Sequence, residues 1–173
     1  ARVSEAAVAA FWDERRQEDA TLPPQPPVAW AFGATPEHAD ELLALVLEGV
    51  KTGTASTVWE YEDGGETMPV VGELSIILDG SGEPQAVILT TALEVVPFDR
   101  VGPEHAHSEG EGDRTLASWR EAHERYWRAH STSPRGFAQD MPVLCERFEL
   151  LWPRPAWAPV RSGHERADAE EGV

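Results

Sequence analysis

The stretch Gly49-Val50-Lys51-Thr52-Gly53-Thr54-Ala55-Ser56 joins an apolar helical pattern to a segment rich in β-forming residues. Lys51 precedes Thr54 by three residues, so one turn can bring an amine and a hydroxyl together. A threonine nucleophile requires such a base beside it. In a regular strand the two side chains would point to opposite faces, because their separation is odd. Gly53 permits the turn or bulge that would bring both to one side.

The residues before this stretch predict a helix. Thr35 followed by Pro36 is typical of a helix start, and Gly49 is typical of a helix end. The apolar residues between them recur at the spacing of one buried helix face, at Ala39, Leu42, Leu43, Val46 and Leu47. A similar spacing of aromatic and histidine side chains predicts a helix over residues 116–130.

The residues after the stretch predict a sheet. Segments rich in β-forming residues and separated by turn residues indicate strands at residues 54–61, 72–78, 85–96 and 143–152. A polar loop is expected between the third strand and the helix over 116–130. Tandem strands with a few helices predict an α+β fold, a small β-barrel flanked by helices that plug its curled sheet.

The two ends of the chain differ in composition from its middle. Residues 4–18 predict a helix capped by Ser4, and the prolines of residues 21–27 predict a stiff connector. The residues from His164 onward are rich in Glu, Asp and Ala, which is typical of a solvated tail. We therefore divide the chain into an N-terminal helix with its connector, a central domain and an acidic tail, at 1–27, 28–153 and 154–173.

Composition limits the class of partner. The chain has 14 Lys and Arg against 31 Asp and Glu, a formal net charge of -17. This charge disfavours non-specific binding to duplex nucleic acid, but it permits a small nucleoside or a short single strand in a local basic pocket. The single Cys145 allows no internal disulfide and fits a reducing compartment. No segment approaches the roughly 20 apolar residues of a membrane span. We expect a cytoplasmic protein that does not bind membranes.

The order of the motifs resembles a known family. Gly-x-Lys-Thr-x-Thr at residues 49–54 is followed by Val71-Gly72-Glu73-Leu74-Ser75 and by His-Ala-x-x-Glu at residues 105–109. This order resembles the ASCH domain (activating signal cointegrator homology), which implies a small barrel related to the PUA RNA-binding domain. The resemblance covers residues 30–152 and is strongest for the longer bacterial ASCH proteins.

The resemblance also implies a catalytic set. Some small bacterial ASCH proteins are N4-acetylcytidine amidohydrolases that use a lysine, a threonine three residues later and a downstream glutamate. These positions fall on Lys51, Thr54 and Glu109, with Glu111 as a competing position for the glutamate. Ser56 stands where the family commonly has an arginine, whose planar fork of donors one hydroxyl cannot replace. Other members bind or cleave RNA. No cofactor and no metal belongs to this prediction.

The implied chemistry assigns a role to each residue. Lys51 would take the proton of the Thr54 hydroxyl, which requires burial to favour the neutral amine. Glu109 would pass a proton to the departing amine, and backbone N–H groups near Gly53 would stabilise the oxyanion. The alternative is that Lys51 caps the end of the preceding helix and Thr54 is an ordinary strand residue.

Other residues are candidates for substrate binding. Trp30 and Trp59 suit base stacking but equally suit core packing, and Arg114 directly follows the acidic segment. The His, Glu and Asp residues that alternate over 105–113 fit a solvated loop better than a metal site. His123 lies on an apolar helical face, where packing is its expected role.

The sequence thus predicts an amidohydrolase that acts on a modified, N4-acetylcytidine-like nucleoside through a lysine-activated threonine. One alternative is a non-catalytic module that binds single-stranded RNA or a nucleotide in the same cleft. Another is an RNA-cleaving protein in which the lysine stabilises charge. The expected partner is a nucleoside or a short single-stranded RNA.

Overall fold

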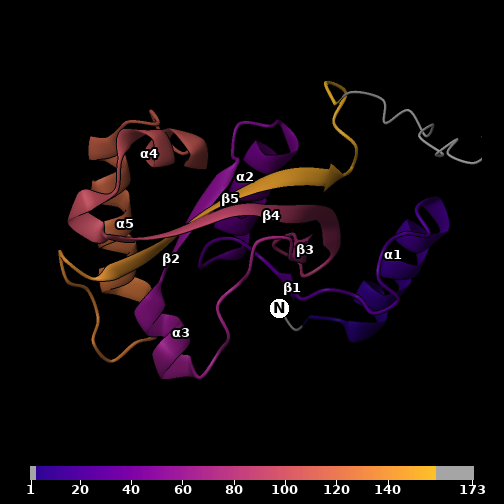
Figure 1. Cartoon of the computed structure of the whole chain (residues 1–173), viewed down its shortest axis with the longest axis horizontal. Helices are drawn as coiled ribbons and strands as arrows, with labels where there is room; N and C mark the ends of the chain where they lie inside the picture. Colours follow the sequence, from indigo (N-terminus) through magenta and orange to yellow (C-terminus); the bar gives the residue numbers. More distant parts are fainter. Residues whose placement is uncertain (1–2, 159–173) are drawn as a thin grey trace, which may run out of the picture.

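The computed structural model describes residues 3–158 and contains one five-stranded sheet with helices packed around it (Figure 1). The strands are β1 (Ala29–Trp30), β2 (Gly53–Thr57), β3 (Leu74–Leu78), β4 (Pro84–Pro97) and β5 (Pro142–Trp152). The helices are α1 (Glu5–Glu18), α2 (Pro36–Leu47), α3 (Val58–Gly64), α4 (Pro103–Glu109) and α5 (Leu116–His130), with a 3-10 turn η1 at Phe98–Arg100. In Figure 1, α4 and α5 lie at one end of the molecule and α1 lies at the other.

The sheet is open, so the predicted barrel is wrong while the α+β class is confirmed. The strand order is β1-β3-β4-β5-β2, with β1 and β2 at the two edges. Closure requires each strand to pair on both sides. β1 has only two residues and pairs with β3, and β3 pairs with β4 only as far as Leu89. Within residues 3–158, the two edge strands β1 and β2 do not pair with each other.

Side-chain caps begin the helices where the sequence predicts them. Ser4 Oγ accepts a hydrogen bond from the backbone N–H of Ala7 at 3.2 Å, which caps α1. Thr35 Oγ1 accepts from the backbone N–H of His38 at 3.2 Å, and Pro36 occupies the first turn of α2. Each cap satisfies an N–H group that has no partner within its helix. The predicted starts of both helices are confirmed.

The buried apolar side chains form three clusters around the sheet. The first lies beneath α2, the second beneath α5, and the third joins α1 to the sheet, with Val46, Trp127 and Trp12 among their most buried members. Trp12 also donates from its indole N–H to the carbonyl of Pro23 at 2.8 Å, which ties the connector to α1. Burial of these faces holds α2 and α5 in place, and both helices line the cavity described below.

Two predicted segments have a different structure. The predicted strand over 54–61 ends at Thr57, whose hydroxyl accepts from the backbone N–H of Glu60 at 3.1 Å and begins α3. The predicted polar loop contains α4, which begins at Pro103 and ends before the left-handed Gly110. Both helices have only seven residues, so neither has room for a repeated apolar pattern. The residues at their ends are the only local sequence signal that could predict these two helices.

Two expectations concern the ends of the chain and membranes. Of the predicted tail at 154–173, residues 159–173 lie outside the part that the structure describes. Within residues 3–158, every helix is too short or too polar to cross a bilayer.

Candidate functional site

The segment after α2 carries Lys51 towards α4. The backbone N–H of Lys51 donates to the carbonyl of Leu45 at 3.0 Å, inside the last turn of α2. The next residue, Thr52, donates its backbone N–H to the carbonyl of Ser108 at 2.7 Å and accepts from the N–H of Phe148 at 3.0 Å. The segment is therefore fixed between α4 and β5 before β2 begins.

A glycine allows α4 to approach this segment. Gly110 ends α4 with a φ of 73°, and a Cβ atom there would lie 2.7 Å from the carbonyl oxygen of Val50. We expect Gly110→Ala to lower the free energy of unfolding by about 2–3 kcal/mol, because left-handed strain and overpacking act together. Urea unfolding measures the loss.

Gly65 provides a matched control for this substitution. It ends α3 with a φ of 66°, and a Cβ atom there would meet nothing within 4 Å. Gly65→Ala should therefore cost only the conformational strain, about 1 kcal/mol. Equal losses in the two variants would contradict the close approach of α4 to the segment that carries Lys51.

The Lys51 side chain is buried, with 2% of its surface exposed. Its Nζ donates to the backbone carbonyl of Glu109 at 3.3 Å and to Glu111 Oε2 at 3.3 Å. It also lies 5.3 Å from the centroid of the Phe32 ring. The amine thus caps the end of α4, so the alternative in which it caps the preceding helix is wrong. One nitrogen therefore donates to a backbone carbonyl and to a carboxylate.

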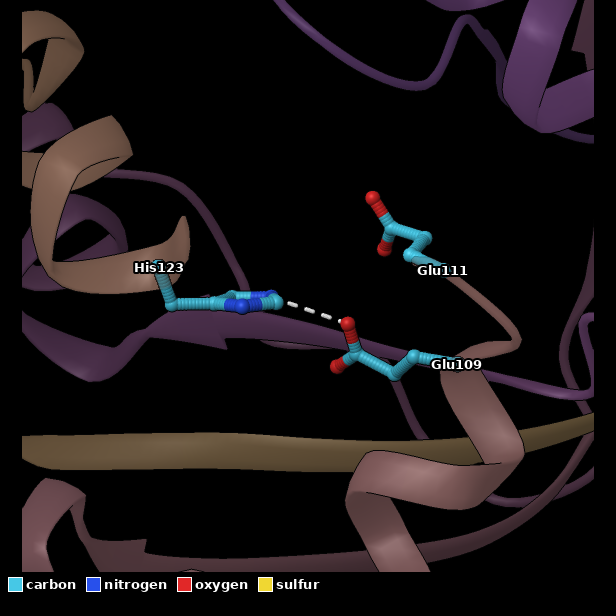
Figure 2. Close-up of side chains that lie close together, drawn as sticks. All are labelled: Glu109, Glu111 and His123. Atoms are coloured by element: carbon cyan, nitrogen blue, oxygen red, sulfur yellow. Dashed lines mark ion pairs between the residues drawn. The ribbon is translucent and has the colours of Figure 1, made fainter. Parts of the chain in front are cut away.

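Glu109 is the most enclosed charged residue of this group, with 1% of its surface exposed. Its Oε1 lies 2.7 Å from His105 Nε2, and its Oε2 lies 2.8 Å from His123 Nε2. Figure 2 shows the imidazole of His123 directed at this carboxylate, with Glu111 beside it. Burial alone would raise the pKa of Glu109, but the charges of His123 and Lys51 and the two imidazole hydrogen bonds hold it well below its usual range.

His123 completes the group from α5. Its Nδ1 lies 2.8 Å from the carbonyl of Trp119, which can only accept, so Nδ1 carries a proton. Its ring stacks on the Trp119 indole with centroids 4.1 Å apart. Burial lowers the pKa of His123, but the adjacent carboxylate of Glu109 outweighs this effect and raises it. The raised pKa of His123 and the lowered pKa of Glu109 both favour an imidazolium that faces an ionised carboxylate.

The sequence interpretation missed this role of His123. The available signal was its position four residues from both Trp119 and Trp127 on one helical face. An imidazole enclosed by indoles requires a polar partner. The partner comes from α4, which was predicted as a loop. The local sequence pattern alone therefore did not identify Glu109 as the partner of His123.

These side chains border a cavity of about 400 Å³. Its polar wall includes Lys51, Thr54, Glu109, Glu111 and His123, and its apolar wall includes Phe32, Tyr126 and Trp127. The volume falls within the usual range for small-molecule sites. The structure therefore brings the predicted lysine, threonine and glutamate to one cavity. The competing Glu111 lies there too, with 30% of its side chain exposed.

The other four predicted residues are not among those that line the cavity. Trp30 packs edge-on against Phe32, with ring centroids 4.6 Å apart, and Trp59 packs beside the cluster beneath α5. Ser56 accepts a hydrogen bond from the Tyr61 hydroxyl at 3.4 Å. Arg114 donates to the carbonyls of His107 and Val50, at 2.9 and 3.3 Å, and so ties the end of α4 to the segment before Lys51.

A divalent metal is one possible occupant of the acidic group. Glu109, Glu111 and His123 each offer a ligand atom, and these atoms lie within 4.8 Å of one another. A metal would require the unprotonated nitrogen of His123 and would lie close to the ammonium of Lys51. The Lys51 amine already binds Glu111, and His123 already pairs with Glu109. The contacts fit a network of ion pairs better than a metal shell.

Comparison with known proteins gives family and fold matches. The model of the ASCH domain matches residues 28–152. A crystal structure of a protein from Enterococcus faecalis is 33% identical, covers 86% of this chain and 90% of its own, and has a TM-score of 0.78. An ASCH domain from Lactobacillus crispatus is 26% identical, covers 86% of this chain and 95% of its own, and has a TM-score of 0.73. No curated protein matches this chain significantly.

Proposed function

This chain belongs to the ASCH domain family, and on that premise we propose that it hydrolyses an exocyclic amide of a modified nucleoside such as N4-acetylcytidine. One observation carries the proposal. A lysine and a threonine from one segment and a glutamate from another line a single cavity, at Lys51, Thr54 and Glu109. The threonine supplies a hydroxyl nucleophile, and the other two groups supply the charge and the proton transfer that it needs.

The size and walls of the cavity support a nucleoside as the substrate. About 400 Å³ accommodates a small molecule rather than a folded polymer. Tyr126, which is partly exposed, provides aromatic surface for contact with a planar base, while Phe32 and Trp127 form the buried apolar wall behind the cavity. The net charge of -17 opposes the approach of a long polyanion.

In the proposed acylation step, Thr54 Oγ attacks the amide carbonyl. Lys51 first passes one proton to Glu111, whose Oε2 lies 3.3 Å from its Nζ, and the resulting amine takes the hydroxyl proton as the O–C bond forms. The carbon–nitrogen bond then breaks, and Glu109 passes a proton to the nitrogen, which leaves as the free exocyclic amine.

Water completes the proposed cycle. It attacks the acyl-threonine ester and loses its proton to the same glutamate that protonated the amine. The ester bond breaks, and Thr54 recovers its proton from Lys51, which then recovers its own from Glu111. The net reaction is amide plus water to amine plus carboxylic acid.

A chromatographic assay tests this proposal. The purified protein is incubated with N4-acetylcytidine, and in parallel with a single-stranded RNA oligonucleotide. We expect equal amounts of cytidine and acetate, and an oligonucleotide of unchanged length. Absence of cytidine above the rate without protein would overturn the proposed substrate.

A nucleotide-binding module is the second candidate, and the state of Lys51 favours it. Its ammonium is held by a carbonyl and a carboxylate, which leaves one N–H to bind a phosphate or a base oxygen. In that case the protein would bind cytidine nucleotides or short single strands without turnover. Calorimetric titration with cytidine monophosphate, in a preparation that forms no cytidine from N4-acetylcytidine, would support this candidate.

A further inference from the structure

We propose that His123 is the store of the proton that Glu109 delivers to the leaving amine. This role rests on the proposed hydrolytic function. It adds a residue of α5 to the lysine, threonine and glutamate of the proposed catalytic set. The observation that carries it is the buried chain of contacts from the carbonyl of Trp119 through His123 to Glu109. His123 and Glu109 both line the cavity.

The geometry leaves the His123 proton one short route. Nδ1 is committed to the Trp119 carbonyl at 2.8 Å, and Nε2 points at Glu109 Oε2 at 2.8 Å. The Nε2 proton can therefore move to Glu109 without rotation of the ring. His105 Nε2 holds the other oxygen, Oε1, at 2.7 Å, so the carboxylate is fixed from both sides. Fixed donors and acceptors of this kind favour directed proton transfer.

The charge states explain why Glu109 needs a proton source. A carboxyl group whose pKa is well below its usual range is ionised at neutral pH and carries no proton of its own. His123, whose pKa is raised by that carboxylate, keeps its proton to a higher pH than a free imidazole does. The imidazolium thus makes an acid available at a site where the carboxylate alone would be a base.

Several other charged or titratable groups face His123 from the surrounding elements. Glu111 raises the pKa of His123 through its charge. Near the carboxylate of Glu109, burial raises the pKa of the Cys145 thiol of β5 to about 12, which keeps that thiol neutral. The remaining groups around the shared cavity and the carboxylate are Lys51, His38, His105, Arg125, Tyr126 and His130. The direct contact with Glu109 is the shortest of the contacts that His123 makes with a charged group.

The proton transfer balances over the cycle. As the carbon–nitrogen bond breaks, the proton on His123 Nε2 moves to Glu109 Oε2 and a proton moves from Glu109 to the nitrogen. The amine leaves neutral, and His123 becomes a neutral imidazole. The water that attacks the acyl-threonine returns its proton through Glu109 to His123. No oxidant, reductant or further reactant is needed.

The pH dependence of turnover tests this role. His123→Gln keeps an amide N–H that can bind Glu109 but cannot titrate. In the wild type, kcat/KM for N4-acetylcytidine should fall as the pH rises through the raised pKa of His123, because the imidazolium is the active form. In His123→Gln, we expect kcat to be about 10²–10⁴-fold lower and this basic limb to disappear. His105→Gln is the matched control and should keep the basic limb, because His123 is intact.

A second readout does not depend on turnover. Side-chain NMR of the full chain can follow the imidazole of His123 through a pH titration. We expect the imidazolium to persist above the ordinary pKa of 6.5, and to titrate at lower pH in Glu109→Gln. A wild type that forms no cytidine would overturn the proposed function. Turnover with an unchanged basic limb in His123→Gln, or a neutral His123 at pH 7, would overturn the proton-storing role alone.

Discussion

Glu109→Ala is expected to lower the free energy of unfolding by about 3–5 kcal/mol. The substitution removes the carboxylate that accepts from His105 and His123 and that stabilises the nearby ammonium of Lys51. All three partners lie in or beside a buried site, so water cannot fully replace the lost charge. Urea unfolding at neutral pH, followed by tryptophan fluorescence, measures the effect.

Two further variants separate burial from charge. Glu111→Ala removes a carboxylate from the same cavity, but 30% of that side chain is exposed, so we expect a loss of only about 1 kcal/mol. Glu109→Gln keeps the volume and one acceptor, and its loss should lie between those of the two alanine variants. If Glu109→Ala and Glu111→Ala cost the same, burial of the carboxylate would not be the cause.

Thr54→Ala is expected to reduce turnover of N4-acetylcytidine by about 10³-fold or more, because it removes the proposed nucleophile. The effect on folding should be small. Thr54 pairs with Glu146 through the backbone ladder of β2 and β5, and alanine keeps that ladder. We expect the free energy of unfolding to change by less than about 1 kcal/mol. Steady-state kinetics and urea unfolding on the same preparation measure both quantities.

Thr54→Ser is the control for the hydroxyl. It removes a methyl group and keeps the oxygen, so turnover should remain measurable. If the Thr54→Ala variant hydrolysed N4-acetylcytidine as fast as the wild type, Thr54 would not be the nucleophile. Direct attack by water on the amide would then be favoured. Loss of turnover in Thr54→Ser, with the fold intact, would show that the methyl group positions the substrate.

The local predictions were most accurate where a long repeat or a cap decides the structure. The helix α2 has twelve residues, and its apolar residues form one stripe along a single face. Thr35 and Pro36 mark the start of this helix. The strands β4 and β5 are long enough for their composition to be unambiguous. In contrast, α3 and α4 are single short helices whose ends are set by Thr57 and Gly110. A short helix depends more on its surroundings than on its own propensity.

The candidate site was predictable only in part for the same reason. Lys51 and Thr54 lie in one motif, so the local sequence was enough to predict that both side chains line the same cavity. The burial of Glu109 depends on α4, and its pairing with His123 joins residues from two helices. No local pattern specifies which polar group an apolar helical face will meet.

The sequence by itself determined the α+β class, the main helices and strands, the family and the Lys51–Thr54 motif. These depend on periodicity, capping and short motifs, which act over one or two turns of chain. Only the tertiary structure decided that the sheet stays open, that Lys51 caps α4 rather than α2, and that the carboxylate of Glu109 raises the pKa of His123. The open sheet depends on how far its short strands pair. The other two depend on burial and on charges from segments distant in the chain, which come together only when the chain folds.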